Sequence, residues 1–129
     1  MKLRLLPDVF VVAKIPATEP FPDWGCTGGF SSVTRTPEEW SVVCETSFLP
    51  DGIRAETDWR IIQIEAVLDF ALTGILSSLL APLAVAGIPV FVLSTYNTDY
   101  VMVRSGHLAH AVFCLSEAGY TWAETPPQG

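Results

Sequence analysis

Residues 88–103 read IPVFVLSTYNTDYVMV, and this stretch decides the fold prediction. Two apolar segments, 90–94 and 99–104, flank a short polar segment that contains Asn97-Thr98-Asp99. Asn, Thr and Asp favour turns because their side chains hydrogen-bond to nearby backbone. The pattern therefore predicts a buried strand, a turn, and a second strand that pairs with the first.

The flanking segments extend this hairpin into a larger unit. Upstream, WRIIQIE at 59–65 has the composition of a strand, and apolar residues recur at helical spacing between Leu72 and Leu83. We expect a helix over 73–86 that Gly87 ends, with its last turn bent or loosened by Pro82. Downstream, the pattern predicts a helix capped by Ser105 and a final strand at 120–123. The order β-α-β-β-α-β is that of a ferredoxin-like unit.

The first half of the chain is richer in strands and poorer in helices. Residues 2–6, 9–15 and 30–34 read as strands, and residues 16–29 hold three Pro and three Gly. Thr36-Pro37-Glu38-Glu39 predicts one helical turn, with Thr as its cap. The predicted fold class is α+β, with two tandem ferredoxin-like units, the first with reduced helices. We place the first unit at 1–57 and the second at 58–125.

Composition and charge limit the functions that are compatible with this chain. The 129 residues carry a net charge of −7, which disfavours binding to nucleic acid and to anionic membranes. The three cysteines lack a paired spacing, which indicates reduced thiols in a cytoplasmic protein. No signal peptide is expected at the start. The uncharged stretch 70–98 is long enough for a membrane span, but Pro82 and Gly87-Ile88-Pro89 interrupt it, so we interpret it as a buried helix and strand.

Three segments resemble one known family. The stretch 88–103 is similar to the LSTYxTDYxLV signature of CASTOR-type ACT proteins, which include arginine sensors that act upstream of the mTOR kinase complex and many uncharacterised bacterial proteins. Residues 30–39, FSSVTRTPEE, resemble the FFSxTxTPE segment of the first ACT unit of that family. Residues 81–84, APLA, match the helix end that precedes the signature. The three segments occur in the family's order at compatible spacing, and the similarity runs from near residue 1 to about residue 123.

The resemblance implies a tandem pair of ACT units that binds an amino acid between units. The longer sensors contain four such units, so a homodimer of this chain would restore a four-unit assembly. The implied function is that of a regulatory sensor module without catalysis or cofactor, with an amino acid or similar small ligand and a protein as its expected partners. The alternative is an ACT-fold scaffold for dimerisation or protein interaction that has no ligand.

An amino acid needs donors for its carboxylate and acceptors for its ammonium group. The free N–H groups and the dipole at the start of the helix near Thr73 suit a carboxylate, and Gly74 allows close approach to the backbone. By resemblance, Thr95, Tyr96 and Asp99 occupy positions that line the arginine site. Pro89 and Val90 match the strand start that closes the pocket from the partner unit, although Pro89 has no N–H to donate. Asp69 is the candidate for the acidic residue of the loop before the helix.

Each of these assignments has a structural alternative. Asp99 could serve only to stabilise the turn, Tyr96 could belong to the core, and Asp69 could cap the start of the helix.

Other groups of potentially reactive residues are better explained by structural roles. His107, His110 and Cys114 share one helix face as three potential metal ligands, yet a solvent face explains them. Cys26 lies in a glycine-rich loop without a neighbouring His to activate it. An enzyme that uses paired carboxylates is the least favoured hypothesis.

Overall fold

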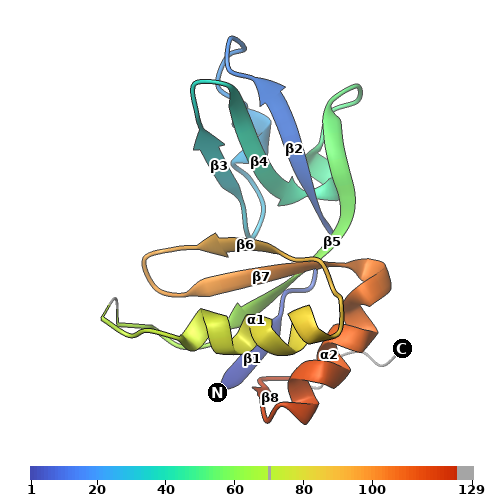
Figure 1. Ribbon diagram of the computed structural model, residues 1–129. Coiled ribbons are helices and arrows are strands. Elements are labelled where there is room, and N and C mark those ends of the chain that lie inside the picture. Colours follow the sequence, from blue (N-terminus) through green and yellow to red (C-terminus); the bar gives the residue numbers. More distant parts are fainter. Residues whose placement is uncertain (70, 125–129) are drawn as a thin grey trace. The chain divides into compact units, whose positions relative to one another are not determined.

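The computed structural model describes residues 1–69 and 71–124 (Figure 1). The described chain forms two compact units. The first is strand-rich with short helices, as the sequence predicts, and the second is α+β. One unit consists of Asp8–Trp59. The other combines Met1–Pro7 with the chain from Arg60 onward. The expected end of the second unit, at residue 125, lies outside the described residues.

The unit of residues 8–59 is a ferredoxin-like arrangement in which 3-10 helices replace both α-helices. Its sheet has the order β3-β4-β2-β5, and all neighbouring strands are antiparallel. The helices are short because Pro16, Pro20 and Pro22 interrupt the first connection, and proline cannot donate a helical hydrogen bond. The elements are β2 (Phe10–Pro16), η1 (Asp23–Gly25), β3 (Ser32–Arg35), β4 (Glu39–Glu45), η2 (Thr46–Phe48) and the first part of β5 (Arg54–Ile64).

The predicted helical turn at Thr36 was wrong. Residues 36–38 connect the hairpin strands β3 and β4 instead. The Thr36 hydroxyl oxygen still accepts hydrogen bonds from the backbone N–H groups of Glu38, at 3.2 Å, and Glu39, at 3.1 Å. The side-chain chemistry that caps helices therefore stabilises a tight turn here. A strand follows the turn because Val42 and Val43, after Trp40, are β-branched and favour strands.

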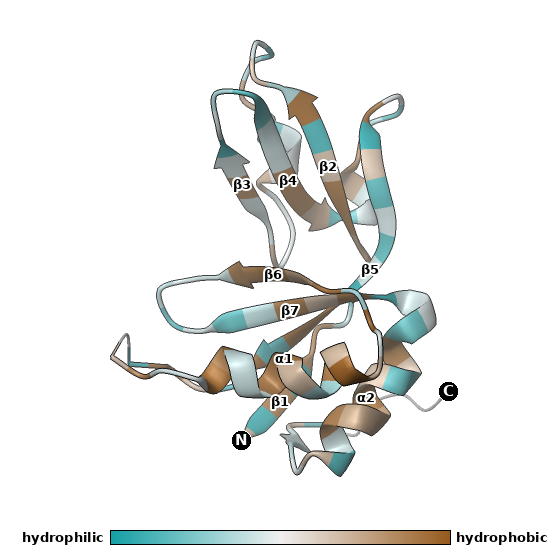
Figure 2. Cartoon of the chain, viewed as in Figure 1, coloured by the Kyte–Doolittle hydropathy of each residue, from teal (hydrophilic) through white to brown (hydrophobic). Residues whose placement is uncertain are grey.

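The second unit has the predicted β-α-β-β-α-β order (Figures 1 and 2). Its first strand is the last part of β5. The predicted hairpin is confirmed, with Leu93 opposite Tyr100 and Ser94 opposite Asp99. Gly87 ends the first helix in the left-handed conformation, at φ 73°. The elements are α1 (Ile75–Val85), β6 (Phe91–Ser94), β7 (Asp99–Arg104), η3 (Ser105–His107), α2 (Leu108–Glu117) and β8 (Thr121–Trp122).

One strand of this unit comes from the other end of the chain. Strand β1 (Lys2–Leu5) lies between β5 and β8, antiparallel to β5 and parallel to β8. In a regular ferredoxin-like unit the fourth strand, here β8, would pair with the first strand directly. Residues 1–7 thus belong with the C-terminal unit, whereas the sequence boundary placed them in the first unit.

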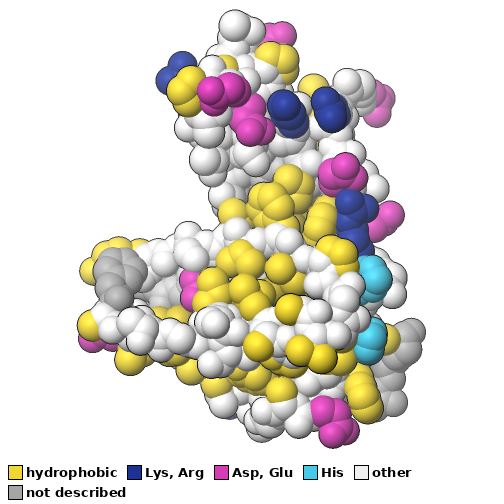
Figure 3. All heavy atoms as spheres, in the orientation of Figure 1, with side chains coloured by type: hydrophobic (Ala, Val, Ile, Leu, Met, Phe, Trp, Pro, Cys, Tyr) yellow, Lys and Arg dark blue, Asp and Glu magenta, His cyan; other side chains and the backbone are white. Residues whose placement is uncertain are grey.

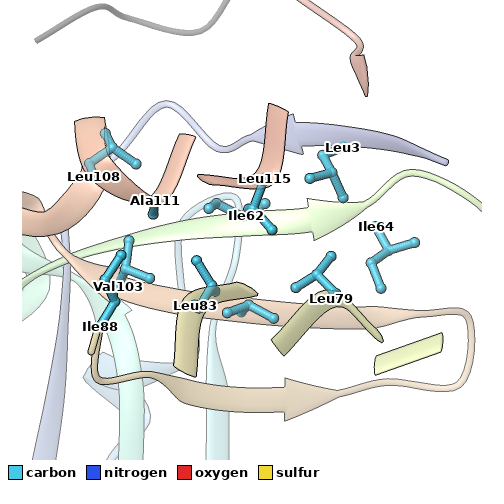
Figure 4. Close-up of a cluster of buried hydrophobic side chains, with 11 residues drawn as sticks. Leu3, Ile62, Ile64, Leu79, Leu83, Ile88, Val103, Leu108, Ala111 and Leu115 are labelled. Carbon is cyan, nitrogen blue, oxygen red and sulfur yellow. The ribbon is translucent and has the colours of Figure 1, made fainter. Parts of the chain in front are cut away.

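Two layers of apolar side chains form the core of the C-terminal unit (Figure 4). In the close-up, the helix side chains face those of β1, β5 and β7. The buried residues recur at helical spacing on α1 and α2 and on alternate positions of β5 and β7. The labelled members are Leu3, Ile62, Ile64, Leu79, Leu83, Ile88, Val103, Leu108, Ala111 and Leu115.

Candidate functional site

A recess of about 330 Å³ lies where the N-terminus of α1 meets the turn between β6 and β7. It is lined by the connection that precedes α1, by the first turn of the helix, and by residues 94–99. All of these segments belong to the C-terminal unit. The volume is at the lower end of the range for small-ligand sites.

Thr98 fixes the turn that forms one wall of the recess. Its side chain is buried, and its hydroxyl donates a hydrogen bond of 2.8 Å to the carbonyl oxygen of Ile64 on β5. Within the turn, the backbone N–H of Thr95 donates to the Thr98 carbonyl at 2.9 Å. The carbonyl of Asn97 accepts a 2.7 Å bond from the N–H of Leu68. The turn is therefore attached both to the sheet and to the connection before α1.

The first turn of α1 lines the recess, and its backbone N–H groups are potential donors there. Gly74 is the N-cap residue, with φ 79°, and no side chain caps the helix. Ile75, Leu76 and Ser77 follow it and line the recess. The first N–H groups of a helix have no partner within the helix, and the helix dipole adds positive potential there, worth about 0.3–1 kcal/mol for an anion. This part of the recess favours a carboxylate.

Two carboxylates face the same recess. Asp99 accepts a short hydrogen bond from the Ser94 hydroxyl through Oδ1. Asp69 accepts a 2.7 Å bond from the N–H of Ala71, also through Oδ1. Among residues 1–69 and 71–124, neither Oδ2 atom accepts a hydrogen bond, and no Lys, Arg or His lines the recess. The acidic part of the recess favours a cationic group.

The recess unites five of the eight residues expected from sequence. Asp69, Gly74, Thr95, Tyr96 and Asp99 line it, whereas Thr73 lines a neighbouring hollow with Met1 and Tyr120. Pro89 and Val90 are exposed just before β6 and do not line the recess. Their expected role, to close a site in a partner unit, remains a prediction. Tyr96 is 80% exposed, so it is not a core residue.

Asp99 and Asp69 also have the structural roles that the sequence left open as alternatives. Asp99 accepts the Ser94 bond across the hairpin, and Asp69 organises its own turn by accepting bonds through both its side chain and its backbone carbonyl. Sequence patterns do not single out the other lining residues, most of which have apolar side chains or belong to the turn. These are Leu68, Leu72, Ile75, Leu76, Ser77, Ser94, Asn97 and Thr98.

Other reactive side chains are isolated from one another. Within the described chain, no three His, Cys, Asp or Glu side chains form a group that could hold a metal ion, and this covers the His107, His110 and Cys114 set. Cys44 is buried, and burial together with the neighbouring Glu45 charge raises the pKa of its thiol, which makes it a poor nucleophile. In the part of the chain that the structure describes, no helix is long and apolar enough to cross a membrane.

Two family models match successive parts of this chain. A family model described as ACT domain matches residues 54–117, and a second model, which describes an N-terminal domain, matches residues 8–52. The chain belongs to the ACT-domain family.

The similar proteins include a curated arginine sensor and a solved bacterial structure. The "Cytosolic arginine sensor for mTORC1 subunit 1" of Homo sapiens is 34% identical over 99 residues, which cover 68% of this chain and 30% of the sensor. This chain therefore spans only about 30% of the length of that curated relative. An Agrobacterium tumefaciens protein solved by X-ray crystallography is 34% identical, with a TM-score of 0.90 over 99% of this chain and 96% of that one.

A more distant structure shares the fold alone. The regulatory subunit of aspartate kinase from Thermus thermophilus, solved in a ligand-free form, has a TM-score of 0.64 at 12% identity. The alignment covers 92% of this chain and 98% of that subunit. Tandem units of this size therefore also occur in a chain named as a regulatory subunit.

Proposed function

We propose that this protein is a regulatory module that binds an amino acid in the recess at the start of α1 and has no catalysis of its own. The observation that carries the proposal is the charge arrangement of the recess. The backbone N–H groups at the start of α1 and the carboxylates of Asp69 and Asp99 line the same recess, and among the described residues no basic side chain lines it. This arrangement complements a molecule with a carboxylate and at least one cationic group.

The ligand's carboxylate binds at the first turn of α1, near Gly74 and Ser77. Its ammonium group, and a cationic side chain where it has one, bind the free Oδ2 atoms of Asp69 and Asp99. Tyr96 is exposed beside the recess and covers the ligand with its ring. Because two carboxylates face the recess, an amino acid with a cationic side chain, such as arginine, binds better than a neutral one.

The name of the arginine sensor among the relatives supports this ligand class. We further propose a cytoplasmic protein that forms a homodimer, with Pro89 and Val90 of one copy closing the recess of the other. Ligand binding then favours the dimer geometry in which it bridges two copies, and a partner protein recognises that state. The proposal includes neither nucleic acid nor membrane among the partners.

A thermal-shift screen of the twenty amino acids tests the proposal. Arginine or lysine at about 100 times its Kd should stabilise the protein by roughly 2.7 kcal/mol. Neutral amino acids at the same concentration should stabilise it less, because they bind more weakly. Asp99→Asn keeps an acceptor for Ser94 but removes the charge, so it should abolish the shift. Asp51→Asn, at an exposed turn of the other unit, is the matched control and should leave the shift intact.

Two outcomes contradict the proposal. If no amino acid stabilises the protein at millimolar concentration, the chain is a scaffold with an unused recess. If a shift occurs and survives Asp99→Asn, the ligand binds elsewhere.

A further inference from the structure

The unit of residues 8–59 contains a hollow of about 720 Å³, which is larger than the recess at the start of α1. It is lined by the end of β2, the start of β5 and the proline-rich connection 19–24. The volume is within the range of small-molecule sites. Much of the lining is apolar or aromatic, with contributions from Ile15, Phe21, Trp24 and Ile53. Neither the sequence motifs nor the proposed function uses this hollow.

The connection 19–24 is attached to the sheet at both of its ends. The indole N–H of Trp40 donates a 3.0 Å hydrogen bond to the carbonyl oxygen of Glu19. The Phe21 ring packs edge-to-face on Trp40, with centroids 5.5 Å apart. Just after the connection, Gly25 lies so close to Val42 that a β-carbon at this position would overlap the valine side chain. The hollow is therefore a preformed feature of the unit, and a ligand does not have to order it.

The two cations among the lining residues, Lys14 and Arg54, belong to the opposite face of the sheet. They are register partners on β2 and β5, and Figure 3 shows Lys and Arg side chains next to each other over these strands. Each is flanked along the chain by apolar residues of the core cluster that includes Trp24. Because successive side chains of a strand point to opposite faces, the two charges point away from the side on which Trp24 packs. The flanking residues are Ala13, Ile15, Ile53 and Ala55.

Three carboxylates remain at the hollow, those of Glu19, Asp23 and Glu38. All three residues are exposed, and among the described residues none of their carboxylates forms an ion pair or accepts a hydrogen bond. Arg35 lies over the Trp40 ring, at 5.5 Å from its centroid, and does not line the hollow. Aromatic and apolar walls are thus combined with negative charge that no cation of the lining neutralises. This combination attracts an organic cation and repels an anion.

We infer that the hollow is a second ligand site, for a protonated arylalkylamine without a carboxylate, of the class of 2-phenylethylamine and tryptamine. The aromatic ring of the ligand packs on Phe21 and Trp24, and its ammonium group binds the carboxylates of the lining. A free amino acid is disfavoured here, because its own carboxylate would face like charges. The hollow differs in this respect from the α1 recess, where the N–H groups of a helix start are available to a carboxylate.

NMR titration of the full ¹⁵N-labelled chain tests this site independently of the proposed function. 2-Phenylethylamine should shift amides within 14–24 and 52–54, whereas shifts within 68–77 and 94–99 report binding at the α1 recess. 3-Phenylpropionate has the same ring but a carboxylate in place of the ammonium group, so it should not bind the hollow. L-Phenylalanine carries both groups and should bind the hollow roughly tenfold more weakly than 2-phenylethylamine, or weaker still.

Two triple variants separate the hollow from the general effect of net charge. Glu19→Gln, Asp23→Asn and Glu38→Gln together should weaken 2-phenylethylamine binding by roughly tenfold or more, about the loss of one charged hydrogen bond. The control variant makes the same change in net charge at exposed residues outside the hollow and should bind as the wild type does. It combines Asp8→Asn, Glu117→Gln and Glu124→Gln.

Three results would overturn the inference. The first is that 2-phenylethylamine at millimolar concentration shifts no amide of 8–59. The second is that L-phenylalanine or 3-phenylpropionate binds the hollow as tightly as the amine does. The third is that the variant without the carboxylates of the hollow binds the amine as well as the control variant does.

Discussion

At the scale of single residues, Thr98 connects the β-hairpin turn to the rest of its unit. Its hydroxyl is buried and bonds to a strand carbonyl, whereas the other threonines in residues 1–124 are more exposed. Thr98→Val keeps the shape and removes this bond, while the Ile64 carbonyl still accepts a 2.9 Å bond from the N–H of Ala66, so we expect a loss of about 0.5–1.5 kcal/mol in the free energy of unfolding. Urea denaturation measures it.

The same substitution tests whether the turn positions the ligand. Because the turn carries Thr95 and Asp99, its loosening should also weaken amino-acid binding. Thr57→Val, at an exposed position of β5, makes the same chemical change without a buried hydrogen bond and should cost little. Equal stability losses in the two variants would show that the Thr98 hydroxyl is not a significant anchor.

At the scale of elements, the end of α1 depends on one glycine. Gly87 adopts φ 73°, and the N–H of Ile88 donates a 3.0 Å bond to the carbonyl of Leu83 across the helix end. A β-carbon at Gly87 meets no atom within 4 Å, so Gly87→Ala tests backbone conformation alone. We expect a loss of about 1–2 kcal/mol, the cost of the left-handed conformation for an L-residue.

Gly106→Ala is the matched control for this element. Its β-carbon also meets no atom within 4 Å, and its backbone is not left-handed. Thermal unfolding should therefore show a lower Tm for Gly87→Ala and no decrease for Gly106→Ala. If both variants unfold at the wild-type temperature, the helix end tolerates another conformation and the argument from φ fails.

At the scale of the whole molecule, the first strand stabilises the unit formed by the end of the chain. Leu3 is fully buried on β1, opposite Ile64. Leu3→Ala should cost about 2–5 kcal/mol, and amide hydrogen exchange should accelerate mainly in 60–122. Ile15→Ala, in the core of the other unit, should accelerate exchange mainly in 8–59. If each substitution affects both units equally, they unfold as one cooperative body.

Local patterns predicted most of the C-terminal unit. The apolar spacing between Leu72 and Leu83 located α1, and the polar stretch Thr95–Asp99 located the β6–β7 turn. Both features depend on neighbouring residues, so a short window of sequence contains the necessary information. The pattern at Thr36 predicted a helical turn wrongly, because the capping chemistry of threonine is the same in a hairpin turn as at a helix start.

The candidate site was predictable in part for the same reason. Gly74 and Asp99 belong to local motifs, and both line the recess. Leu68 and Ser77 carry no distinctive chemistry, so only the folded chain shows that they line it too. The expected contribution of Pro89 and Val90 concerns a second copy, and it stays a prediction.

The sequence by itself determined most elements of the C-terminal unit, the net charge of −7, and the polar turn that carries Asp99. Only the tertiary structure decided that β1 lies between β5 and β8, and that Lys14 on β2 lies opposite Arg54 on β5. The physical reason is the same in both cases. A strand's alternation of apolar residues specifies which face is buried, but its neighbour is selected by packing between segments that are far apart in the chain.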